Sequence, residues 1–87
     1  MANKRTLKHS ITLFCEELFA ECVAASLYGQ NQANAEALFF SIFKMEDDFI
    51  RRVSHPEPGM PARLYYIDLR EKFTIQASEI IDQLNNL

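Results

Sequence analysis

The chain has 87 residues, of which 48% are hydrophobic, and its formal net charge is −3 at neutral pH. A chain of this length folds as one domain with a thin core, and its hydrophobic content argues against disorder. The small negative charge gives no global reason to expect binding to nucleic acid or to an anionic membrane. No apolar run approaches the roughly 18 residues of a membrane span, so we expect no association with a membrane.

The N-terminal basic residues precede an apolar stretch, which is the outline of a signal peptide. Glu16, Glu17 and Glu21 interrupt that stretch, and we therefore expect no signal peptide. The two cysteines, Cys15 and Cys22, are seven residues apart, which on a helix separates them by about 10 Å along the axis. This separation is too long for a disulfide, so we expect buried free thiols in a reducing cytoplasm.

A first helix is predicted from about Thr6 to Tyr28, with Gly29 as a plausible C-cap. The apolar residues that recur every three or four positions form a core-facing stripe: Leu7, Ile11, Phe14, Leu18, Cys22 and Ala25, with Cys15 and Phe19 alongside. A second apolar stripe lies across the same helix: Leu13, Ala20, Ala24 and Leu27. One small bundle covers only one face of a helix, so this second stripe predicts an interface.

A break over residues 29–32 precedes a second predicted helix, from about Asn34 to Ser54. Asn31 and Asn34 are both possible N-caps, and Glu36 would then lie in the first turn. The core stripe contains Ala35, Leu38, Ile42, Met45, Phe49 and Val53, and is widened by Phe39, Phe43 and Ile50. The polar side carries three i,i+4 ion pairs, namely Lys44 with Asp48, Asp47 with Arg51 and Asp48 with Arg52. Phe40 falls on this polar side.

All three prolines lie between Ser54 and Pro61, and they end the second helix. Pro58 and Gly59 suit the central positions of a type II turn, in which the glycine takes a positive φ. A third helix is predicted from Pro61 or Ala62 to about Asn85. Its core positions have heptad-like spacing: Tyr66, Leu69, Phe73, Ala77, Ile80, Leu84 and Leu87. Leu64 and Ile75 lie on the opposite, polar side.

Three long helices with short connections predict an all-α, antiparallel, up-down-up bundle over residues 1–87. We expect this bundle to form a homodimer through antiparallel contacts between the first helices. The expected interface consists of Leu13, Ala20, Ala24 and Leu27, with Phe40 or Ile75 as additions.

The sequence contains no phosphate-binding glycine loop, no CxxC and no HExxH, and we expect no catalytic residue, metal or cofactor. Arg51 and His55 faintly resemble the arginine-histidine motif of HEPN-type ribonucleases, but their spacing is one residue shorter than that family's usual minimum. A histidine at a helix C-terminus is favoured there by the helix dipole. An enzyme is therefore the third of the functions that we consider.

An up-down-up bundle brings most of the cations to one end of the molecule, among them Arg51, Arg52, His55 and Arg63. These four residues, beside the stiff loop, form a candidate anion-binding site. Such a site would allow binding of a phosphate-bearing ligand or, less readily, of nucleic acid. The simpler explanation is that cations stabilise a helix C-terminus.

The stretches 19–28 and 52–61 resemble a group of short, mostly uncharacterised bacterial proteins. The resemblance covers the whole chain, and it implies a compact helical protein and no activity. The function that we favour from the sequence is a small cytoplasmic interaction or scaffold protein that acts as a homodimer, and a further protein partner is possible. An anion- or nucleic-acid-binding module is the alternative.

Overall fold

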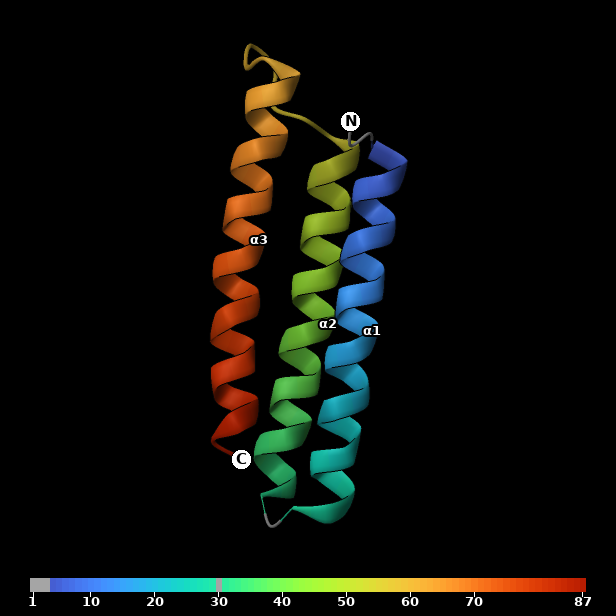
Figure 1. The fold of residues 1–87 in the computed structure, drawn as a ribbon, viewed down its shortest axis with the longest axis vertical. Helices are drawn as coiled ribbons and strands as arrows, with labels where there is room; N and C mark the ends of the chain where they lie inside the picture. Colours follow the sequence, from blue (N-terminus) through green and yellow to red (C-terminus); the bar gives the residue numbers. More distant parts are fainter. Residues whose placement is uncertain (1–3, 30) are drawn as a thin grey trace.

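The computed structural model describes residues 4–29 and 31–87, which form three antiparallel α-helices. Helix α1 is Lys4–Tyr28, α2 is Gln32–Ser54 and α3 is Ala62–Asn85. The described residues include no strand. Figure 1 shows the three helices side by side along the long axis of the molecule, which measures 47 × 18 × 17 Å. The expectation of an all-α protein with helices running up and down is confirmed.

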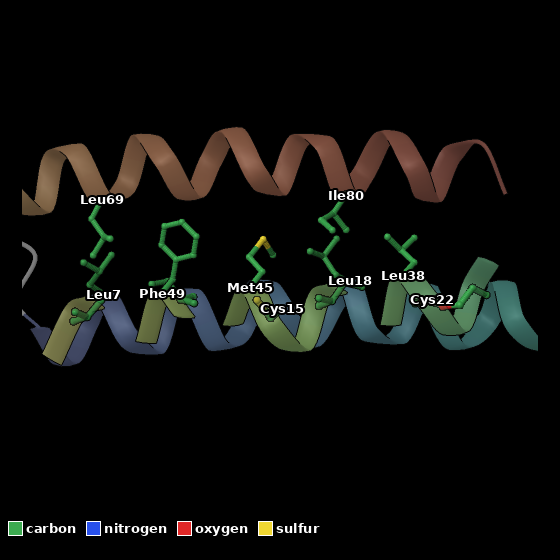
Figure 2. Packing of buried hydrophobic residues seen from close by; sticks show 13 residues of the cluster. Leu7, Cys15, Leu18, Cys22, Leu38, Met45, Phe49, Leu69 and Ile80 are labelled. Atoms are coloured by element: carbon green, nitrogen blue, oxygen red, sulfur yellow. Dashed lines mark hydrogen bonds between the residues drawn. The ribbon is translucent and has the colours of Figure 1, made fainter. Parts of the chain in front are cut away.

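Each helix is stabilised by an apolar stripe that it buries against its neighbours. All six predicted core positions of α2 are buried. The buried residues of α1 are Leu7, Ile11, Cys15, Leu18 and Cys22. Helix α3 buries fewer side chains, namely Leu69, Ala77 and Ile80. Figure 2 shows Leu69 and Ile80 of α3 pointing toward the pair formed by α1 and α2. The core is therefore densest between α1 and α2, and α3 covers one side of that pair.

Aromatic rings connect the helices near the middle of the core. Phe73 of α3 meets Phe49 of α2 and Phe14 of α1 edge to face, with ring centroids 5.2 and 5.8 Å apart. Such pairs add about 0.5–1.5 kcal/mol beyond the area that they bury. Phe73 therefore packs α3 against both other helices.

Two tyrosines in the first turns of α3 bind the last carbonyls of α2. The Tyr65 hydroxyl donates to the carbonyl oxygen of Arg52 at 2.8 Å, and the Tyr66 hydroxyl donates to that of Val53 at 3.1 Å. The last carbonyls of a helix have no partner within the helix, so these bonds satisfy groups that would otherwise depend on water. They also fix the start of α3, which projects beyond the end of α2 in Figure 1.

The loop between α2 and α3 contains the predicted turn. Gly59 has a φ of +85°, and the Met60 amide donates to the Glu57 carbonyl oxygen at 3.4 Å. This bond closes a four-residue turn with Pro58 and Gly59 at its centre, as the sequence predicts. An L residue at position 59 would be strained there.

The helix ends differ from the predictions in three respects. Helix α2 begins at Gln32, so Asn34 is inside the helix and Glu36 lies beyond its first turn. Asn31 occupies the N-cap position, but its side chain makes no capping hydrogen bond. Gly29 follows α1 as expected of a C-cap, and its amide donates to the Ala25 carbonyl oxygen at 2.8 Å, but its φ is not positive, so it is not a left-handed cap. The break predicted over residues 29–32 includes Gln30, which lies outside the described residues.

Phe39 and Phe43 are also placed differently from the prediction. Both were expected to widen the core stripe, yet their side chains remain about half exposed. The reason is the position of α3, which covers only one side of the α1–α2 pair. Among the described residues, no helix lies on the opposite side to bury these two rings.

Candidate interaction surfaces

The four residues of the predicted anion site lie at the end of α2 and the start of α3. Arg51 and Arg52 are in the last turn of α2, His55 follows it, and Arg63 is the second residue of α3. His55 and Arg63 are exposed. The structure therefore brings Arg51, Arg52 and His55 together at the end of α2, whereas Arg63 stands on the projecting start of α3 (Figure 1).

Two of these cations are already paired within α2. Arg51 binds Asp47 at 3.2 Å and Arg52 binds Asp48 at 3.0 Å. The Arg52 guanidinium also lies 4.9 Å from the centre of the Phe49 ring. These ion pairs partly neutralise this end of the molecule and hold Arg52 against α2. Tyr65 likewise has its hydroxyl engaged with backbone carbonyls rather than free for a ligand.

The two thiols are buried between α1 and α2, as the sequence predicts. Cys15 and Cys22 are free, and the Cys22 thiol donates to the Ala35 carbonyl oxygen at 3.0 Å. Burial raises the pKa of Cys15 to about 12, with a further contribution from the carboxylate of Glu46. Burial also raises the pKa of Cys22. Because the thiolate is the nucleophile, both sulfurs are unsuited to thiol chemistry.

A cleft of about 620 Å³ opens between α2 and α3 on one side of the molecule. Met45 and Ile80, both buried, belong to its lining. Most of the remaining lining is polar or charged: Ser41, Lys44, Asp48, Arg52, Lys72, Gln76, Glu79 and Gln83. Arg52 and Lys72 are bound to aspartates of their own helices. Ile75 lies in this lining and is 60% exposed.

An aromatic face covers the side of the α1–α2 pair that α3 leaves open. We define it as Phe19, Val23, Leu27, Phe39, Phe40 and Phe43. The Phe19 and Phe39 rings connect the two helices, with centroids 4.8 Å apart. Phe43 lies about 140° around α2 from Asp48, which borders the cleft with α3. Most of the aromatic face is therefore on a different side of α2 from the cleft, and the two meet at Lys44, which lines the cleft and lies over the Phe40 ring.

The aromatic face is exposed and contains a small hollow. Phe40 and Phe43 are 58% and 55% exposed, and the Lys44 ammonium lies 4.9 Å from the centre of the Phe40 ring. The hollow has a volume of about 120 Å³ and is almost entirely apolar. Its lining comes from both helices: Cys22, Val23, Ser26 and Leu27 of α1, and Ala35, Glu36 and Phe39 of α2. An apolar side chain from another molecule would fit such a site.

The predicted α1 stripe is exposed over its whole length. Leu13 and Leu27 have exposed side chains, and Ala20 and Ala24 between them are exposed too. Leu27 belongs both to this stripe and to the aromatic face. Ile75 does not join the stripe, because it lies in the cleft between α2 and α3.

Sequence reasoning missed the aromatic face because it assigned Phe39 and Phe43 to the core. Phe19, Phe39 and Phe43 lie at the edges of their apolar stripes, and an edge residue is buried only if a third helix covers that side. The sequence also did not predict that the Tyr65 and Tyr66 hydroxyls bind carbonyls of α2, because these bonds depend on where α3 starts. Val23 was the one available hint, since it widens the apolar surface of α1.

Comparison with known proteins found no match to a family model, to a curated protein or to a solved structure. Among residues 4–29 and 31–87, no three His, Cys, Asp or Glu side chains gather closely enough to hold a metal ion. None of the three described helices has a stretch apolar and long enough to span a membrane.

Proposed function

We propose that this protein is a small helical interaction protein that acts as a homodimer. The observation that carries the proposal is the aromatic face, where three phenylalanines within five positions of α2 are exposed. Contiguous apolar surface on a small soluble protein is typical of an interface. Phenylalanine is also among the residues enriched at the centres of interfaces.

The size of the molecule gives a second reason. A chain of 87 residues has a thin core, and burial of a further apolar surface would add to its stability. The dimer would bury side chains that the three-helix bundle leaves in water. The resemblance to short bacterial proteins agrees with this role and adds no activity to it. The buried free thiols favour a reducing compartment such as the cytoplasm.

Sedimentation equilibrium of the purified chain tests the proposal. We expect the mass of a dimer at high micromolar concentration, with dissociation to the 10.1 kDa monomer on dilution. The unfolding temperature should also rise with protein concentration, because association stabilises only the folded state. A monomer that persists into the submillimolar range would contradict the proposal.

The alternative, anion binding at the basic end, has less support. Arg51 and Arg52 are paired with Asp47 and Asp48, so an anion would have to compete with these carboxylates. Chromatography on heparin separates the two functions, because binding through phosphate-like groups weakens steeply with salt. We expect weak retention that Arg63→Ala does not change.

A further inference from the structure

We propose that α2 binds α2 of a second copy of this chain, antiparallel, about a two-fold axis that passes beside Phe40. This inference rests on the proposed homodimer, and it names the surface and the orientation. Three features of α2 and its surroundings support it: the small side chain opposite Phe43, the order of the charges and the spacing of the large side chains.

An antiparallel partner would place its Phe43 over a small, exposed side chain of α2. When a two-fold axis at residue 40 relates two antiparallel helices, each residue faces a residue of the partner helix. That partner residue lies equally far from position 40, on its other side. Phe43, three residues after the axis, thus faces position 37 of the partner helix. That position is Ala37, which is exposed and lies on the side of α2 that faces α3 rather than beside the hollow. Each copy would therefore pack the Phe43 ring over the small side chain of Ala37 of the other.

The charges beside Phe40 have the order that the same axis requires. Glu36 precedes Phe40 by four residues and Lys44 follows it by four, so the axis places Glu36 of each copy against Lys44 of the other. Glu36 is exposed, and within the described part of the chain it forms no ion pair. Lys44 lies over Phe40, at the centre of the contact. A parallel arrangement would instead bring like charges together, which disfavours it.

The α1 stripe fits a second copy less well. Its two large side chains, Leu13 and Leu27, are 14 residues apart, which corresponds to about 21 Å on a helix. Only Ala20 and Ala24 contribute apolar surface between them. The aromatic face concentrates larger side chains over a shorter distance, since Phe39, Phe40 and Phe43 lie within five positions of α2.

Charge exchange tests the orientation. Glu36→Lys and Lys44→Glu should each weaken dimerisation about tenfold, because each replaces two exposed attractive pairs by repulsive ones. The double variant restores opposite charges, so its dissociation constant should return to within about threefold of the wild-type value. Sedimentation equilibrium measures the three constants. A double variant that is no tighter than the single variants would overturn the inference.

Phe43→Glu tests the surface. It should give a monomer with unchanged helical circular dichroism, because Phe43 contributes little to the core of one chain. Leu64→Glu is the matched control, since Leu64 is 54% exposed on α3, and it should leave the dimer intact. If Ala24→Glu produces monomers and Phe43→Glu does not, this inference fails while the homodimer stands. A wild-type monomer would overturn both proposals.

Discussion

Glu46 is a partly buried carboxyl group at the junction of α1 and α2. Its pKa is raised, chiefly by burial and then by the charges of Glu16 and Asp47. A raised pKa means that the folded state binds the proton more tightly than the unfolded chain does. The contribution of Glu46 to stability is therefore most favourable below the ordinary pKa of 4.5, and it is lost as the pH rises through the raised value.

Glu46→Gln removes this charge and should raise the free energy of unfolding at neutral pH. The gain should shrink toward zero below pH 4.5, where the wild-type carboxyl is protonated in both states. Urea denaturation at several pH values measures the difference. Glu71→Gln, on an exposed position of α3, is the control and should change the stability little. A Glu46→Gln protein that is less stable than the wild type at neutral pH would contradict this account.

Among the helices, α3 depends most on contacts outside its own core stripe. It buries three side chains where α2 buries six. The hydroxyls of Tyr65 and Tyr66 compensate in part, since they attach its first turns to the carbonyls of Arg52 and Val53. The start of α3 is thus determined by hydrogen bonds as well as by apolar packing.

Tyr66→Phe should destabilise the protein by about 1 kcal/mol, because it deletes one hydrogen bond and leaves a carbonyl near the protein surface. Tyr65→Phe should have a similar effect. Amide hydrogen exchange should show the loss of protection concentrated in the first turns of α3. Tyr28→Phe is the matched control, because that side chain is 88% exposed, and it should leave both measurements unchanged. Equal effects of the substitutions at 28 and 66 would argue against a role for these bonds.

For the whole molecule, the sequence predicts the helices and the centre of the core, but not which sides of the helices meet. Periodicity identified all six buried positions of α2, because a stripe centre is buried whichever neighbours it has. It misplaced Phe39 and Phe43, because burial at a stripe edge depends on where α3 lies. The turn at Pro58 and Gly59 was predictable, since it depends on local backbone geometry alone.

The same limit applies to the candidate surfaces. Periodicity placed the α1 stripe on the outside of the helix, and the structure leaves those residues exposed. The hollow between α1 and α2 could not be foreseen, because it is formed by residues from both helices. Likewise, sequence spacing predicted the Asp47–Arg51 and Asp48–Arg52 pairs, but not their consequence for a site at this end of the molecule.

The buried position of the thiols has a consequence for how this protein responds to oxidants. Cys15 and Cys22 are 0% and 1% exposed, so a reagent reaches either sulfur only when α1 separates from α2. The rate of alkylation by iodoacetamide should therefore be set by how fast, or how often, α1 separates from α2. This rate should increase strongly in urea at concentrations below the midpoint of unfolding. Mass spectrometry distinguishes the species, and we expect doubly labelled and unlabelled chains with few singly labelled ones. In this protein, oxidative damage to cysteine would accordingly be a result of unfolding rather than its cause.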